Sequence, residues 1–361
     1  MESIYYVLCW HCHRRCVHCY DDRFRPYVRD DLEQVVAEAE RNAPRIISHL
    51  PESMQYLDRQ TPDPEHPSGF RQRTGRIIIS GGDVLTDPVR ERVLYPTLKA
   101  LVARYRDRGG VKIIVQTTGD LLTDTILREL LDIGVWSVSA AGMDDYHVGM
   151  QGDRRQSLIN KLRAMFENAG MISVAEHNAR RDMDMGGPPV YSLFGATDDA
   201  WIGKIWPRGR AWTNNLSKAT MQDNFCNAWS GGLGFLEHGY NGSEVSIDPD
   251  GNVFPCCIKT DTPLGNLTDE NLLDILRDLA GHPAMEAINA GKPERMGLSF
   301  GWSVEDYLRT CHTTTPDGSA YANLCIGCDQ FHKQVLGAVL RERRAHRLVQ
   351  QQLRIPLRSV S

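Results

Sequence analysis

Three cysteines near the start of the chain, Cys12, Cys16 and Cys19, follow directly on an apolar run at residues 4–8. A short apolar run bounded by polar residues predicts a β-strand, so the cysteines lie on the loop that leaves the end of a strand. Their spacing is Cys-x3-Cys-x2-Cys. Three thiolates on one tight loop can hold three irons of a cubic 4Fe–4S cluster and leave the fourth iron open to a small molecule.

Other metal sites fit this segment less well. Cys9 and Cys12 form one Cys-x2-Cys pair and Cys16 and Cys19 another, with three residues between the pairs. Zinc ribbons separate such pairs by roughly 15–20 residues. A bacterial ferredoxin run has a different order of spacings and ends in Cys-Pro. Cys9 is then left over, and we interpret it as a buried thiol at the end of the strand.

The cysteine spacing, at this place in the chain, resembles that of the radical S-adenosylmethionine (SAM) superfamily. In that family the open iron chelates SAM, and an electron from the cluster cleaves a C–S bond to give a 5′-deoxyadenosyl radical. The family usually has a carbocyclic aromatic residue before the third cysteine, where this chain has His18. The resemblance implies that Cys12, Cys16 and Cys19 ligate a 4Fe–4S cluster that binds SAM.

Strand and helix patterns alternate through the first two-thirds of the chain, which predicts a parallel sheet covered by helices. The resemblance implies an α/β fold, an open, partial (β/α)6 TIM-like barrel followed by a small C-terminal α+β module. Functional residues are then expected at the carboxyl ends of the strands. The proline-containing stretch 51–75 predicts a long polar loop. The expected strands are residues 4–8, 77–79, 111–117, 135–139, 172–175 and 202–206.

Polar residues and glycines follow several of these strands. The family carries Gly-Gly-Glu after its second strand and binds the SAM amino group there, and this chain has Gly81-Gly82-Asp83. The resemblance extends to the ends of the third, fourth and fifth strands. The candidate cofactor-binding residues are therefore Gly81, Gly82, Asp83, Gln116, Ser139 and Glu176.

Two further segments follow strand ends. Asp144, Asp145 and His147 either face a substrate or lie on an exposed loop. Gly209-Arg210-Ala211 is similar to a sequence common where the family's barrel ends.

The second cysteine-rich region lies in the C-terminal third. Residues 246–257 read as a hairpin around Pro-Asp-Gly, since proline fixes one dihedral angle and glycine supplies a positive φ. This region resembles the SPASM and shorter twitch modules of radical SAM enzymes, which implies one auxiliary 4Fe–4S cluster. Its best ligands are Cys226, Cys256, Cys325 and Cys328, with Cys257 and Cys311 as reserves.

Two alternatives remain for the thiols of this region. Four thiolates also suit a structural zinc ion that staples the hairpin. Cys311 has a separate candidate role as a catalytic hydrogen-atom donor to a substrate radical.

The length of 361 residues suggests two domains, which we place at 1–212 for the barrel and 213–330 for the SPASM/twitch-like module, followed by a basic helical tail at 331–361. The net charge of −5 gives no case for nucleic acid binding. The sequence has no run of roughly 20 apolar residues and no signal-peptide pattern, so we expect no membrane partner and a cytoplasmic location. Clustered cysteines then read as metal ligands in a reducing compartment.

The resemblance implies a radical SAM oxidoreductase whose auxiliary cluster accepts an electron from the substrate radical. We expect dehydrogenase-like oxidation or rearrangement of a small molecule, because the first strand begins at about residue 4 and leaves no room for a preceding peptide-recognition domain. One alternative is a peptide (RiPP) maturase that receives its peptide from a separate protein. Another is a non-enzymatic iron–sulfur or zinc scaffold. The expected reductant is a flavodoxin or ferredoxin.

Overall fold

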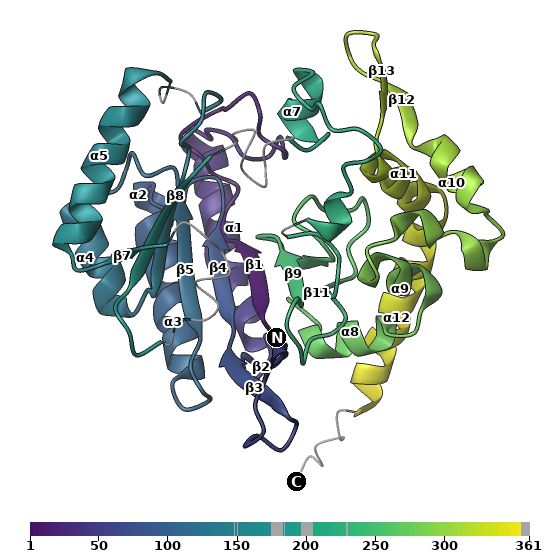
Figure 1. Ribbon diagram of the computed structural model, residues 1–361, viewed down its shortest axis with the longest axis horizontal. Coiled ribbons are helices and arrows are strands. Elements are labelled where there is room, and N and C mark those ends of the chain that lie inside the picture. The colour runs from purple at the N-terminus through teal and green to yellow at the C-terminus, as the bar shows by residue number, and fades with distance from the viewer. Residues whose placement is uncertain are drawn as a thin grey trace.

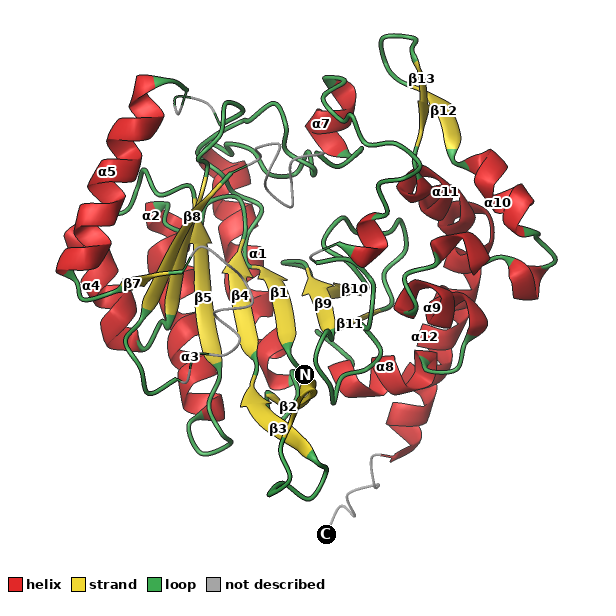
Figure 2. Cartoon of the chain, in the orientation of Figure 1, coloured by secondary structure: helices red, strands yellow, loops and turns green. Residues whose placement is uncertain are grey.

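The structure is a computed structural model that describes residues 1–147, 149, 151–174, 183, 185–195, 205–228 and 230–354. The N-terminal half of the chain forms a sheet covered by helices, and the C-terminal half forms a mainly helical part (Figure 1). Strands of both parts lie side by side near the N-terminus (Figure 2). Among the described residues, no helix has both the length and the apolar character that crossing a membrane requires.

The sheet of the N-terminal part is parallel, as the sequence predicts. Its strands lie in the order β1-β4-β5-β6-β8-β7, and every neighbouring pair is parallel. The order follows the chain except at the far edge, where β7 lies outside β8, and the described strands do not close into a complete barrel. The bounds are β1 (Ser3–Val7), β4 (Arg76–Ser80), β5 (Lys112–Thr117), β6 (Ser137–Ala141), β7 (Ile172–Ser173) and β8 (Val190–Phe194).

Alternate residues of these strands face two different surroundings. Ile77, Ile79 and Ile113 belong to the main hydrophobic core, while Ile78 and Ile114 belong to a smaller cluster. Buried apolar side chains on both faces are what a parallel sheet requires. The helices of this part are α1 (Arg29–Ser48), α2 (Asp87–Val89), α3 (Tyr95–Tyr105), α4 (Asp124–Ile133) and α5 (Asp153–Asn168), with a π-helical turn at Arg90–Leu94.

The predicted C-terminal hairpin continues the same sheet. Strand β9 (Glu244–Ile247) pairs in parallel with β1, and β10 (Asn252–Phe254) returns antiparallel to β9. Gly251 closes the turn with φ of 83°, a backbone conformation that favours glycine. Strand β11 (Gly265–Asn266) ends this side of the sheet. The hairpin thereby places its cysteines beside the strand that delivers the first cysteine loop.

Helices cover the hairpin on its outer side. They are α8 (Leu272–Leu279), α9 (Pro283–Asn289), α10 (Val304–Thr310), α11 (Leu324–Phe331) and α12 (Gly337–Arg354), whereas the short helix α7 (Gly209–Thr213) lies against the N-terminal cysteine loop. Strand β12 (His312–Thr314) pairs with β13 (Ala320–Ala322). Helix α12, in the predicted basic tail, packs on this module. Arg344 and Arg347 both bind the buried Glu270 carboxylate, at 3.0 and 2.7 Å.

Three predicted segments differ from the structure. The stretch 51–75 contains a hairpin, β2 (Gln55–Pro62) and β3 (Phe70–Thr74), whose mostly exposed faces lack the apolar alternation of a half-buried strand. Of the predicted strand 172–175, Ile172 and Ser173 form the edge strand β7, residue 174 is not in a strand and residue 175 lies outside the described part, and β8 takes the place beside β6. In the predicted strand 202–206, residues 202–204 lie outside the described part, and Ile205 and Trp206 are not in a strand.

Candidate iron–sulfur and SAM site

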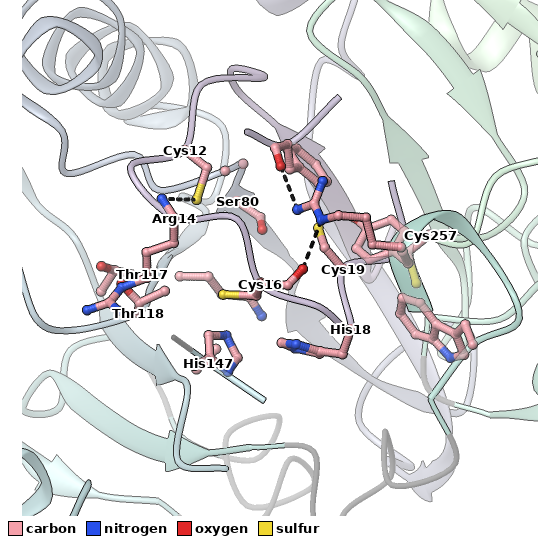
Figure 3. Close-up of a pocket in the computed structure, with 18 of the residues that line it drawn as sticks. Cys12, Arg14, Cys16, His18, Cys19, Ser80, Thr117, Thr118, His147 and Cys257 are labelled. Atoms are coloured by element: carbon pink, nitrogen blue, oxygen red, sulfur yellow. Dashed lines mark hydrogen bonds between the residues drawn. The ribbon is translucent and has the colours of Figure 1, made fainter. Parts of the chain in front are cut away.

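The three cysteines of the N-terminal loop line one cavity of about 190 Å³ (Figure 3). The cavity lies at the carboxyl ends of β1, β4, β5, β6 and β8, where a barrel of this kind places its functional residues. Cys12 and Cys16 are buried and Cys19 is partly buried. The sequence expectation that the three thiols face one site at the strand ends is therefore met by their placement.

Burial also controls the protonation of these thiols. It raises the pKa of Cys12 to about 12 and that of Cys19 to about 11. The thiols of Cys12 and Cys19 are therefore protonated in the absence of a metal, and binding of iron as thiolates would release their protons.

Arg210, which follows the last barrel segment in the sequence, holds the cysteine loop in place. Its guanidinium donates hydrogen bonds to the carbonyl oxygens of Cys16 at 2.9 Å and Phe24 at 2.7 Å, and Ala211 N donates to Cys19 O at 3.2 Å. Gly209 has φ of 54°, and a Cβ at this position would lie 2.5 Å from the Tyr20 carbonyl carbon. The sequence marked Gly209-Arg210-Ala211 only as a barrel-end signature, and the structure makes Arg210 part of the site.

The Gly81-Gly82 turn packs against the cysteine loop. Gly82 N donates to Cys9 O at 3.1 Å. A Cβ on Gly82 would lie 2.1 Å from His11 O and 2.5 Å from Cys12 Cβ, so only glycine fits here without displacing the loop. Both glycines also line the cavity. The two glycines therefore let the second strand end approach the first, and they leave backbone atoms open to a ligand.

The carboxylate of Asp83 is turned into the protein. It is 1% exposed and accepts hydrogen bonds from the hydroxyls of Thr117 and Thr118 and from the backbone N–H groups of Leu85 and Thr118, at 2.6–3.1 Å. Asp83 is not among the described residues that line the cavity. This geometry favours a role in joining β4 to β5 and disfavours the predicted direct contact with the SAM amino group.

The remaining predicted cofactor-binding residues are placed differently from one another. Gln116 lines the cavity and accepts a hydrogen bond from Tyr5 Oη at 3.1 Å. Ser139 is buried and accepts a hydrogen bond from Ser192 Oγ at 3.2 Å, and it is not among the described lining residues. Glu176 lies outside the described residues. Gln116 is thus the one of these three that the structure places at the cavity.

A histidine that the sequence left open also reaches the cavity. His147 lines it, with Nδ1 2.8 Å from an oxygen of the buried Asp144 carboxylate. The ring of His147 lies 4.6 Å from that of His18, centroid to centroid. Burial lowers the pKa of His18 to about 4, so its imidazole is neutral. Asp145, in contrast, is exposed and pairs with Arg155 at 2.8 Å.

The four predicted auxiliary ligands, which come from three distant segments, share a second, mostly apolar cavity. Cys226 lies on a 3₁₀ turn at Phe225–Asn227, Cys256 follows β10, and Cys325 and Cys328 lie on α11. All four line the same cavity. Burial and the neighbouring cysteines raise the pKa of Cys226 well above its ordinary value.

The spacing of the thiols bears on which metal they suit. Within the described residues, the sets of three or more potential ligand atoms within 4.8 Å of one another are His18–Asp144–His147 and His13–Asp83–Asp120. Neither set contains a cysteine. A tetrahedral zinc ion with Zn–S bonds of about 2.3 Å would bring its thiolates to about 3.8 Å from one another. In the described residues, no three cysteine sulfurs lie within 4.8 Å of one another, so both groups of thiols are spaced too widely for a single zinc ion and suit a cubic cluster better.

The two reserve cysteines have separate positions. Cys257 is buried and lines the first cavity, while its neighbour Cys256 lines the second. Cys311 is fully buried beside Gly327 and is among the described lining residues of neither cavity. The geometry therefore disfavours Cys311 as a hydrogen-atom donor to a substrate in the first cavity.

Comparison with protein-family models matches residues 240–293 to SPASM, an iron–sulfur cluster-binding domain. The match contains the β9–β10 hairpin, Cys256 and Cys257. A search of the curated proteins finds no significant match.

Several solved structures overlap loosely with this chain. BtrN in complex with AdoMet and 2-DOIA is 13% identical, with a TM-score of 0.41 over 85% of this chain and 92% of that one. The anSMEcpe structure with bound AdoMet and the Cp18Cys peptide is 13% identical, with a TM-score of 0.41 over 96% and 99%. Streptococcus suis SuiB bound to precursor peptide SuiA is 11% identical, with a TM-score of 0.41 over 84% and 74%.

The family match confirms the predicted auxiliary iron–sulfur module, and the parallel sheet confirms the predicted α/β fold class. The three-cysteine loop sits at the end of the first strand of that sheet. Residues 240–293 are therefore similar to the SPASM iron–sulfur cluster-binding domain, and the N-terminal three-cysteine loop lies on the same sheet as this module.

Proposed function

We propose that this protein is an enzyme that generates a 5′-deoxyadenosyl radical and oxidises a small-molecule substrate, with Cys12, Cys16 and Cys19 as ligands of the SAM-binding cluster. The auxiliary ligands are Cys226, Cys256, Cys325 and Cys328. When bound, a cluster held by Cys12, Cys16 and Cys19 would supply the electron for reductive cleavage of SAM, and a cluster held by the four C-terminal thiols would supply an acceptor for an electron from the substrate.

The position of the Cys256-Cys257 pair carries the oxidative assignment. Cys256 lines the auxiliary cavity, and Cys257 lines the first cavity, which holds the SAM-type cysteines Cys12, Cys16 and Cys19. Two consecutive residues of one turn therefore line both cavities. An electron released in the first cavity therefore has a short route to the second site.

The chain's own residues shape the first cavity for this chemistry. Arg210 fixes the loop, and the cavity wall is mostly apolar, which suits a reactive radical. Oxidation of an alcohol also releases a proton. His147, which Asp144 orients through Nδ1, presents a basic group at the cavity wall.

A peptide maturase is the second candidate, because the same two sites would serve it. One experiment separates the candidates. The anaerobically reconstituted protein is given SAM and dithionite together with either perdeuterated polyols or perdeuterated peptides, and deuterium is measured in 5′-deoxyadenosine. We expect transfer from the polyols, whereas transfer from peptides alone would favour the maturase.

The scaffold alternative is tested by replacing Cys12, Cys16 and Cys19 together with alanine. The wild-type protein should hold about eight irons as two cubane clusters, and the variant about four. The variant should form no 5′-deoxyadenosine. Undiminished 5′-deoxyadenosine formation in this variant, or its absence in the fully loaded wild type, would refute the proposed activity.

A further inference from the structure

Lys259 is a buried lysine between the two cysteine loops, and burial lowers the pKa of its ammonium group while the neighbouring Asp21 carboxylate opposes that shift. It follows Cys256 by three residues, is 8% exposed, and lines the auxiliary cavity. Its backbone N–H donates to Cys256 O at 3.2 Å. Its φ is 65°, in the left-handed region that favours glycine. The chain thus holds a long charged side chain at a position where the backbone alone would favour glycine.

The ammonium group reaches the loop of the SAM-type cysteines. Nζ lies 3.1 Å from an Asp21 carboxylate oxygen, two residues beyond Cys19. It also lies 4.5 Å from the ring centroid of Trp10 and 5.4 Å from that of Phe24, distances typical of cation–π contacts. The side chain therefore runs from one cysteine loop to the other.

Asp21 provides an ionised counter-charge. Burial alone would raise its pKa, but hydrogen bonds from Arg23 and the charge of Lys259 outweigh burial and lower it to about 2. Arg23 donates to both Asp21 oxygens, at 3.0 and 2.8 Å, and lies 3.8 Å from Asp248. Because Arg23 retains Asp21 without help from Lys259, removing the lysine charge does not leave this carboxylate unpaired.

We propose that the Lys259 ammonium raises the reduction potential of the auxiliary cluster and so makes it a better acceptor of the substrate's electron. A fixed positive charge stabilises the state that carries the additional electron, and net charge is one of the factors that set iron–sulfur potentials. The proposal rests on the proposed function, since it assumes that the four C-terminal thiols hold a redox-active cluster.

The test is a potentiometric titration of the holoprotein followed by electron paramagnetic resonance. The Cys12, Cys16 and Cys19 triple variant identifies the auxiliary signal. Lys259→Met should shift the midpoint potential of that signal to more negative values. Lys259→Arg, which keeps the charge, and Lys161→Met, which removes an exposed lysine on the distant α5, should leave it unchanged.

An unchanged auxiliary potential in iron-replete Lys259→Met would overturn the proposal, as would a shift confined to the SAM-type cluster. If Lys259→Met does not take up iron, Asp21→Asn decides, because removal of the anion should shift the auxiliary potential to more positive values. No shift or a negative shift in Asp21→Asn then refutes the proposal. Zinc in the auxiliary site would defeat the proposed function as well, and metal analysis separates that outcome from a failure of the lysine alone.

Discussion

Replacement of Asp83 by alanine separates a structural role from contact with SAM. The Asp83 carboxylate accepts hydrogen bonds from the backbone N–H groups of Leu85 and Thr118 and from two threonine hydroxyls. The hydroxyls can rotate toward other acceptors, such as the Asp120 carboxylate that Thr118 already contacts. The two backbone donors cannot, and at 1% exposure of Asp83 water does not replace the lost oxygens.

An orphaned buried donor costs about 1–3 kcal/mol, so two predict that Asp83→Ala lowers the free energy of unfolding by about 2–6 kcal/mol. Urea unfolding followed by tryptophan fluorescence measures this change. Titration with SAM and iron analysis run in parallel. We expect weaker SAM binding only as a consequence of a disturbed loop, together with reduced iron uptake at the N-terminal site. Asp132→Ala, at an exposed position on α4, is the control and should leave the free energy of unfolding, the affinity for SAM and the iron content unchanged.

A direct contact with the SAM ammonium makes the opposite prediction. Removing such a charge-assisted hydrogen bond costs about 1.5–3 kcal/mol of binding and leaves the stability of the free protein unchanged. If Asp83→Ala unfolds within about 0.5 kcal/mol of the wild type, takes up its full iron and still binds SAM at least tenfold more weakly, the structural interpretation of Asp83 is wrong.

Three further outcomes follow from the structure. Arg210→Ala should lose iron from the N-terminal site to a chelator faster than the wild type, because the carbonyls of Cys16 and Phe24 lose their hydrogen-bond donor. The auxiliary irons should be unaffected, and equal rates of iron loss in the two proteins would show that Arg210 does not hold the cysteine loop. Cys325→Ala with Cys328→Ala should lose about four irons yet still cleave SAM, and complete loss of cleavage would contradict two independent sites. Burial alone would raise the pKa of Asp120, but hydrogen bonds from neighbours including His13 hold it well below its ordinary value. Its stabilisation is therefore present above about pH 4 and lost as the pH falls further, so acid unfolding should be shallower in Asp120→Asn, and identical curves would refute the linkage.

The sequence determined the features in which neighbouring residues act together. Cys12, Cys16 and Cys19 lie within eight residues, so any fold that makes a tight loop there brings their thiols to one site. The apolar runs determined β1, β4 and β5 for the same reason, since burial on both faces depends on local composition. The turn at Gly251 was likewise readable from proline, aspartate and glycine at consecutive positions.

Only the tertiary structure decided which distant segments meet. Cys226 and Cys325 share a cavity although they lie 99 positions apart, and the sequence pointed to them only through the resemblance to SPASM modules. Three of the four groups that donate to Asp83 belong to Thr117 and Thr118, at the end of the next strand of the sheet, and their position depends on strand pairing and not on a local pattern. Lys259 and Asp21 are joined because β9 pairs with β1. Such contacts depend on pairing and packing over long separations, which leave no local periodicity for a sequence pattern to record.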